Sequence, residues 1–234
     1  MRLAVFGTGG VGGYFGGRLA QAGEDVTFIA RGDHLRAIQT SGLTVDSLDG
    51  YFVIYPAKAT DDVNEIGVVD LVIVGVKAWQ VPEAARAMKP LIGPGTTVLP
   101  LQNGVDAVPQ LTEELGGERV IGGLCKIVSF VAGPGYIRHA GFAPSIVIGE
   151  QDNRRSERIL TIEKTLNDAG LEVTIAPDIK GALWMKFLFI ASFSGVGAIA
   201  NAPAGILRTD PESPSPASAT VTVLFFRRPM NLQA

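Results

Sequence analysis

The sequence predicts an α/β protein, with a doubly wound parallel sheet followed by an incomplete all-helical segment. Two observations favour this class. Apolar strand-like runs alternate with helical stretches as far as about Ala176, the pattern of a sheet with helices on both faces. Over residues 178–200 the pattern changes to one long apolar helix. We expect a first domain over 1–177, part of a helical domain over 178–210 and an irregular tail over 211–234.

A glycine motif follows the first predicted strand. After the apolar residues 3–6 come Gly7-Thr8-Gly9-Gly10-Val11-Gly12, and a helical run follows. In this position, G-x-G-x-x-G predicts a Rossmann-type dinucleotide site. Gly7 permits the turn, Gly9 lets the backbone approach a pyrophosphate, and Gly12 lets helix and strand pack closely. The helix N-terminus offers N–H groups to the phosphates. A purely structural turn is the alternative.

Arg31 lies at the end of the second predicted strand. An NAD site usually has an acidic residue here, which binds the ribose 2′-hydroxyl. A guanidinium instead pairs with a 2′-phosphate through charge-assisted hydrogen bonds. The sequence therefore favours NADP(H) over NAD, unless Arg31 is an ordinary solvated cation.

Composition argues against several classes of protein. The 234 residues are 47% hydrophobic and 18% charged, with a net charge of −3, as in globular rather than disordered chains. Without a basic stripe, nucleic acid is not an expected partner. One cysteine, Cys125, excludes an intrachain disulfide, and the N-terminus lacks the pattern of a signal peptide. Lys186 and serines interrupt the apolar stretch over 183–199, so we expect no membrane span and a cytoplasmic protein.

Polar side chains follow two further predicted strands. Lys77 follows the apolar run over 68–76, and Asn103 follows the strand that ends near Leu101. Ligands of open α/β sheets bind beyond the carboxyl ends of the strands. Lys77 would present a cation to a carboxylate or phosphate, and Asn103 an amide to substrate or nicotinamide. A surface lysine and a common Asn-Gly turn are the alternatives.

Lys186 is unusual within the predicted long helix. Its neighbours three and four residues away are Ala182, Leu183, Phe189 and Ile190, all apolar. Desolvation lowers the pKa of a lysine and makes it a better proton donor near neutral pH. Reduction of a ketone by hydride needs such a donor, because charge builds on the carbonyl oxygen. The alternative is a lysine whose stem packs along a domain interface.

The two histidines give no sign of a metal site. His34, His139 and Cys125 lack metal-ligand spacing, and no Ser-His-Asp arrangement can be assembled from them. We therefore predict no metal, and we expect His139, within a strand, to be structural.

Taken together, these residues resemble the ketopantoate reductase (2-dehydropantoate 2-reductase) family. The matching segments are Gly7-x-Gly9-x-x-Gly12, Arg31, Val76-Lys77-Ala78-Trp79-Gln80, Gln102-Asn103-Gly104 and Leu183-Trp184-Met185-Lys186. The resemblance implies NADPH-dependent reduction of 2-dehydropantoate, a small 2-keto acid, to pantoate in pantothenate and coenzyme A biosynthesis. It implies that Lys186 is the general acid and that Asn103 lies near nicotinamide and substrate. It also makes Lys77 and Gln80 cofactor contacts and Arg31 the ligand of the 2′-phosphate.

The chain departs from the family pattern in two places. Family members often have asparagines four and eight residues after the catalytic lysine, where this chain has Ile190 and Ser194. Ser194 could still donate a hydrogen bond to substrate, but another small 2-keto acid stays open as the substrate.

The second departure is the C-terminal segment. After about residue 212 the sequence is rich in proline and serine, as expected of a truncated or frame-shifted member. An NADPH-binding protein without activity is therefore the non-enzyme alternative. A homodimer is compatible with the sequence, which does not determine the oligomeric state.

Overall fold

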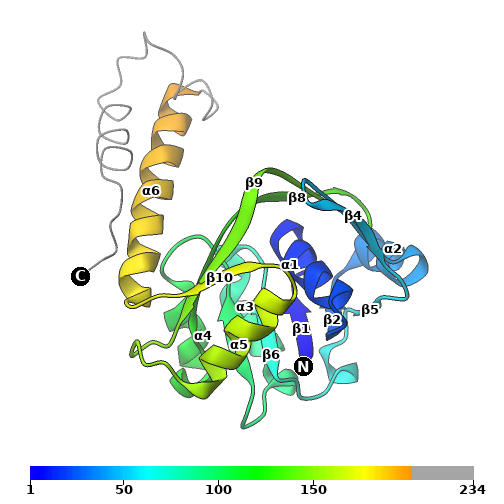
Figure 1. Ribbon diagram of the computed structural model, residues 1–234, viewed down its shortest axis with the longest axis horizontal. Coiled ribbons are helices and arrows are strands. Elements are labelled where there is room, and N and C mark those ends of the chain that lie inside the picture. The colour runs from blue at the N-terminus through cyan, green and yellow to red at the C-terminus, as the bar shows by residue number, and fades with distance from the viewer. Residues whose placement is uncertain (202–234) are drawn as a thin grey trace. The chain divides into compact units, whose positions relative to one another are not determined.

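The computed structural model describes residues 1–201, without the side chains of residues 193, 196 and 200 (Figure 1). The chain divides into two compact units, Met1–Leu183 and Trp184–Ala234. The α/β fold predicted from the sequence is confirmed in the first unit. Its centre is a five-stranded parallel sheet in the order β5-β2-β1-β6-β7.

The elements of the first sheet alternate along the chain. The strands are β1 (Arg2–Phe6), β2 (Asp25–Ile29), β5 (Lys58–Thr60), β6 (Leu71–Val74) and β7 (Thr97–Pro100). The helices are α1 (Gly10–Gln21), α2 (Gly32–Ser41), α3 (Val81–Ala87) and α4 (Ala107–Leu115). Short 3₁₀ turns are η1 (Val63–Glu65), η2 (Ala78–Gln80), η3 (Lys89–Leu91) and η4 (Gly117–Arg119). Every residue of β6 and β7 is buried, as expected of strands covered on both faces.

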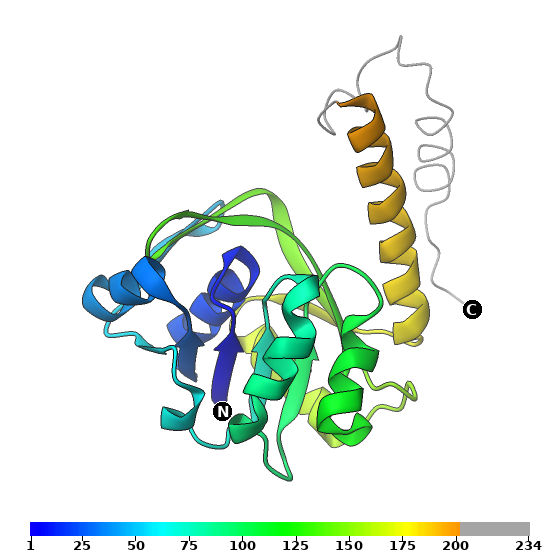
Figure 2. The ribbon, with the colours of Figure 1, turned by 180° about the vertical axis from the view of Figure 1, so that it is seen from behind.

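The two faces of β1 belong to different hydrophobic clusters. Leu3 and Val5 pack with residues of α1 and α2, whereas Ala4 and Phe6 pack with residues of α3 and α4. Successive residues of a strand point to opposite faces, so helices cover both sides of the sheet. Figure 2, seen from behind, shows α3 and α4 on the side opposite α1.

A second sheet, which the sequence analysis did not predict, lies across α1. Its strands are β3 (Leu43–Ser47), β4 (Gly50–Ile54), β8 (Gly122–Gly133), β9 (Tyr136–Gly149) and β10 (Glu172–Ile175). Their order is β10-β9-β3-β4, and β8 pairs with β9. Strands β3 and β4 form an antiparallel hairpin around Asp49-Gly50. Helix α5 (Glu157–Asp168) precedes β10, and the side chain of Ser156 caps its N-terminus.

Strand β9 is longer than its sequence pattern suggests. Its strand-like runs over 136–139 and 145–149 are separated by a segment with Gly141 and Pro144, but all of these residues form a single strand. Gly141 takes a positive φ of 89°, and the pairing with β8 shifts register between Lys126 and Val128. Such irregularities let a strand continue through a segment whose composition resembles a turn.

Helix α1 lies between the two sheets. Tyr14 and Phe15 are fully buried, and the cluster around them joins Val5 of β1 to Val45 of β3 and Ile137 of β9. The ring of Tyr14 lies 4.8 Å from that of His139 on β9. Figure 1 shows β8 and β9 arching over α1. The start of α1 is therefore held from two sides.

The long helix predicted from residue 178 is confirmed as α6 (Ile179–Ala200). Ile179 and Leu183, near its start, are buried with Leu124 and Ala176. The first compact unit ends at Leu183, inside this helix. The separate helical domain over 178–210 stays a prediction, and the tail over 211–234 lies outside the described residues.

Helix α6 also meets a simple criterion for a membrane span. Among the described residues, Ile179–Ile199 is one stretch of 21 residues with a mean hydropathy of 1.6. Core helices of soluble proteins meet the same criterion, so length and composition do not assign a membrane here.

Candidate cofactor and substrate site

The glycine turn is tied to the end of β2. The backbone N–H groups of Gly7 and Thr8 donate to Ile29 O at 3.3 and 3.1 Å, and Thr8 Oγ1 donates to the same oxygen at 3.0 Å. Gly7 has a φ of 97°, a conformation that glycine adopts without steric cost. These bonds fix the turn where β1 ends and α1 begins.

The start of α1 fits a phosphate group. Its N-cap, Gly9, offers no side-chain cap, and the N–H groups of a first helical turn have no partner within the helix. A Cβ placed on Gly9 would meet no atom within 4 Å, so the space beside it is open. At Gly12, by contrast, a Cβ would collide with the carbonyl oxygen of Gly7. The three glycines match the roles of a pyrophosphate-binding turn.

Arg31 lies on the next strand end. It is the N-cap residue of α2, two residues after the end of β2. Its side chain is 73% exposed, and Nη2 lies 4.0 Å from Glu83 Oε1 on α3. An exposed guanidinium in this position is available to an anion, although a carboxylate competes for it.

Lys77 and Gln80 form one local structure after β6. Lys77 is exposed and precedes the turn η2. The backbone N–H of Lys77 donates to Gln80 Oε1 at 3.1 Å. Gln80 therefore orders the loop that presents Lys77, as a capping side chain does at a helix start.

Asn103 follows β7 and is exposed. Its neighbour Gln102 is buried, and Nε2 of Gln102 donates to Val74 O at 2.8 Å and to Val76 O at 3.0 Å. Gln102 thereby joins the end of β7 to the end of β6 and fixes where the Asn103 loop begins. No role was predicted for Gln102 from the sequence, although its place directly before the Asn-Gly pair could have indicated one.

The structure brings four of the predicted elements to one edge. Because neighbouring strands run in the order β2-β1-β6-β7, their carboxyl ends place Arg31, the glycine turn, Lys77 and Asn103 side by side along the sheet. This is the edge at which open α/β sheets bind ligands. Lys186 and Ser194 lie on α6 in the second unit, where Lys186 is half-buried and Ser194 exposed. Their roles stay predictions.

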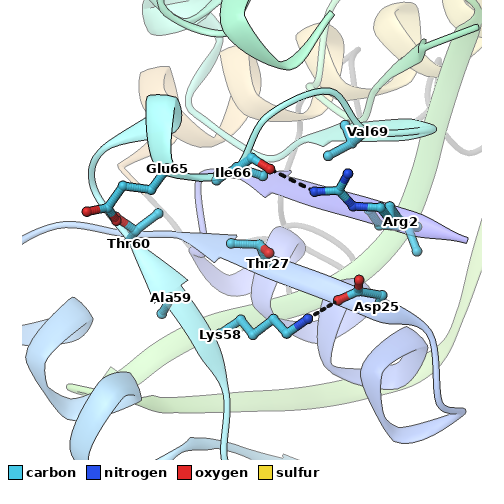
Figure 3. A pocket seen from close by; sticks show the side chains of 10 residues that line it. Arg2, Asp25, Thr27, Lys58, Ala59, Thr60, Glu65, Ile66 and Val69 are labelled. Atoms are coloured by element: carbon cyan, nitrogen blue, oxygen red, sulfur yellow. Dashed lines mark hydrogen bonds and ion pairs between the residues drawn. The ribbon is translucent and has the colours of Figure 1, made fainter. Parts of the chain in front are cut away.

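A cavity of about 360 Å³ lies elsewhere, at the amino ends of β1 and β2 (Figure 3). The connection from β5 to β6 contains only the short turn η1, so no helix covers the sheet there. Its charged groups already have partners. The Arg2 guanidinium donates to Ile66 O at 2.8 Å, and Lys58 pairs with Asp25 at 2.6 Å. We do not assign this cavity to the site.

Comparison with known proteins gives concordant matches. Residues 3–153 match the family described as "Ketopantoate reductase PanE/ApbA". An uncharacterized oxidoreductase of Bacillus subtilis, YkpB, is 35% identical over 90% of this chain and 69% of its own length. A 2-dehydropantoate 2-reductase of Mesorhizobium japonicum is 31% identical over 90% of this chain and 70% of its own length.

A solved structure agrees with these sequence matches. The crystal structure of 2-dehydropantoate 2-reductase from Porphyromonas gingivalis superposes with a TM-score of 0.85 at 30% identity. The match covers 91% of this chain and 76% of the other. The family match extends over well more than half of the 234 residues and includes the glycine turn, Arg31, Lys77 and Asn103. The chain belongs to the ketopantoate reductase family.

Proposed function

We propose that this chain binds NADP(H) along the carboxyl edge of its first sheet and reduces 2-dehydropantoate to pantoate. One observation carries the proposal. The uncapped start of α1, with open space beside Gly9, lies between Arg31 on one side and Lys77 and Asn103 on the other. This arrangement offers N–H groups to a pyrophosphate and separate polar groups to each end of a dinucleotide.

The preference for NADPH rests on Arg31. A guanidinium in the place of the usual acidic residue would bind the 2′-phosphate that distinguishes NADP from NAD. Hydrogen bonds to charged groups contribute about 1.5–3 kcal/mol, so Arg31→Ala should weaken NADPH binding by roughly 10- to 100-fold. Affinity for NADH should change little. Fluorescence titration with both cofactors tests this preference, and equal losses for NADPH and NADH would contradict it.

The chemistry assigns a role to each predicted residue. A bound reduced nicotinamide would supply a hydride to the keto carbon. Asn103 would orient the reacting groups by hydrogen bonds, Lys77 and Gln80 would contact the cofactor, and Ser194 would bind substrate. Lys186 would donate a proton to the keto oxygen as negative charge develops there, which yields the hydroxy acid.

Lys186→Ala tests the proton donor. Loss of general acid catalysis should lower turnover by roughly 10²- to 10⁴-fold, while NADPH affinity stays unchanged. Steady-state NADPH oxidation with 2-dehydropantoate and a separate NADPH titration measure the two effects. A parallel loss of cofactor affinity would contradict the role.

Two other functions are tested alongside this one. Ile190 and Ser194 replace the family's usual asparagines, which favours a test of other small 2-keto acids as substrates. NADPH binding without turnover is the second alternative. A substrate panel under one NADPH assay separates the three functions. We also propose a cytoplasmic location, since the single cysteine, Cys125, is buried and suits a reducing compartment.

A further inference from the structure

His34 connects the glycine turn to a distant hairpin. The imidazole is half-buried on α2. Its Nε2 lies 2.7 Å from Thr8 O in the glycine turn, and the N–H of Gly135, between β8 and β9, lies 3.0 Å from its Nδ1. His34 thus contacts the glycine turn, 26 residues before it in the sequence, and the hairpin turn, 101 residues after it.

The two partners fix the tautomer of His34. A backbone N–H can only donate and a backbone carbonyl can only accept. Nδ1 must therefore accept from Gly135, and Nε2 must carry the proton that it donates to Thr8 O. The ring is neutral and singly oriented, because a proton on Nδ1 would face the N–H of Gly135.

The carbonyl that His34 holds belongs to the peptide between Thr8 and Gly9. This peptide is planar and trans, so its carbonyl and its N–H point in opposite directions. Holding Thr8 O toward α2 therefore turns the N–H of Gly9 away from α2. Gly9 is the N-cap of α1, beside the open space described above.

The β8–β9 hairpin packs against both elements that His34 connects. A Cβ placed on Gly10 would lie 2.6 Å from the carbonyl carbon of Ser129 on β8, and one placed on Gly135 would lie 3.0 Å from Ala37 Cβ on α2. The strand β8 thus contacts the start of α1, and the hairpin turn contacts α2. His34 is the hydrogen-bonded link among these three segments.

We propose that His34 is a positioning residue that orients the Thr8–Gly9 peptide for the pyrophosphate of the cofactor. This role rests on the proposed binding of NADP(H) at the glycine turn. His34 need not touch the cofactor, because it acts through the peptide that it holds.

Substitutions at His34 can separate its two hydrogen bonds. His34→Gln keeps a donor near the position of Nε2, whereas His34→Asn keeps an acceptor near Nδ1, and His34→Ala removes both. A net hydrogen bond contributes about 0.5–1.5 kcal/mol, so His34→Ala should weaken NADPH binding about 3- to 10-fold. The His34→Asn variant should bind NADPH as weakly as the His34→Ala variant. The His34→Gln variant should bind NADPH almost as tightly as the unaltered chain.

A matched control is available on the same hairpin. His139 is also buried and makes two hydrogen bonds, from Ser47 Oγ to Nδ1 at 2.8 Å and from Nε2 to Phe142 O at 2.9 Å. It has no bond to the glycine turn. His139→Gln should lower the thermal midpoint without changing NADPH affinity.

The experiment titrates NADPH and adenosine 2′-monophosphate into the full chain and each variant, and records each thermal midpoint. Adenosine 2′-monophosphate lacks the pyrophosphate, so its affinity should survive every His34 substitution. Equal losses for both ligands, or NADPH binding by His34→Asn as tight as by His34→Gln, would overturn the role of His34. If the unaltered chain does not bind NADPH, the proposed function itself fails. If it binds and His34→Ala binds equally well, only the role of His34 fails.

Discussion

At the scale of single residues, Glu83 would compete with a bound phosphate for the guanidinium of Arg31. Glu83 lies 4.0 Å from its guanidinium, and both side chains are at least 70% exposed. An exposed ion pair contributes only about 0.2–1 kcal/mol, so it does not block Arg31. Glu83 would, however, stand beside the negative charges of a 2′-phosphate.

Glu83→Gln should therefore tighten NADPH binding about two- to fivefold, because it frees Arg31 and removes a like charge. The gain should shrink as salt is added, since salt screens exposed charges. Titrations at low and high ionic strength measure both effects. NADH, which lacks the phosphate, is the control ligand, and an equal gain for NADH would contradict the explanation.

At the scale of one element, two adjacent glycines at the start of α1 differ in their expected roles, one in cofactor binding and one in stability. Adjacent glycines have opposite surroundings, since Gly9 faces open space and Gly10 faces the backbone of Ser129. Gly9→Ala should leave the thermal midpoint unchanged but weaken NADPH binding, because its Cβ would stand where the backbone approaches the pyrophosphate.

Gly10→Ala should instead destabilise the chain by about 1–3 kcal/mol, because its Cβ would press on β8. Urea unfolding and NADPH titration of the two variants form a matched pair. If both variants were equally stable, the contact between β8 and the start of α1 would not exclude a Cβ at position 10.

Most strands of the first sheet could be predicted because a buried parallel strand is a continuous apolar run, whereas the three-residue edge strand β5 was not predicted. Runs such as Leu71–Val74 are apolar without interruption, and glycines and polar residues mark their ends. The candidate site followed from the same rule, since the strand ends of a doubly wound sheet converge at one edge. Arg31, Lys77 and Asn103 could therefore be placed at one edge from the sequence alone.

The second sheet could not be predicted in this way. Residues 141–144 resemble a turn and lie at the register shift, without partners on β8, and β9 continues through them because it pairs with β8 on both sides. The bond from Gly135 to His34 also depends on this hairpin, which places Gly135. Contacts between distant segments have no local pattern in the sequence, so both were missed.

At the scale of the whole first unit, Glu150 ties the end of β9 to α5 and η4. Its buried carboxylate accepts from Arg158 Nε at 2.7 Å, Arg158 Nη2 at 2.6 Å and Ser156 Oγ at 2.5 Å. Arg158 also donates to Glu118 O in η4. Burial raises the pKa of Glu150, but these hydrogen bonds and the Arg158 charge hold it below its ordinary value of about 4.5.

The sign of this shift predicts a pH dependence. A carboxyl group whose pKa is lower in the folded state stabilises the fold above its unfolded pKa. That contribution should be lost as pH falls from about 4.5 through the folded pKa. Glu150→Gln should cost about 1.5–3 kcal/mol at neutral pH, and the difference from the unaltered chain should vanish in acid.

Urea unfolding across this pH range measures the difference. The neighbouring pair Asp152–Arg154 is mostly exposed, so Asp152→Asn is the matched control and should have almost no effect. A Glu150→Gln deficit that persists unchanged in acid would contradict the assignment.

The position of α1 between two sheets has a consequence for synthesis of the chain on the ribosome. Its inner partner, β1, is made first, but the strands that cover Tyr14 from the other side include β9, which ends at Gly149. A nascent chain that has emerged only as far as α4 would hold the glycine turn without its covering hairpin. Because synthesis is vectorial, we expect the glycine turn to reach its final structure only after the second sheet has formed over α1.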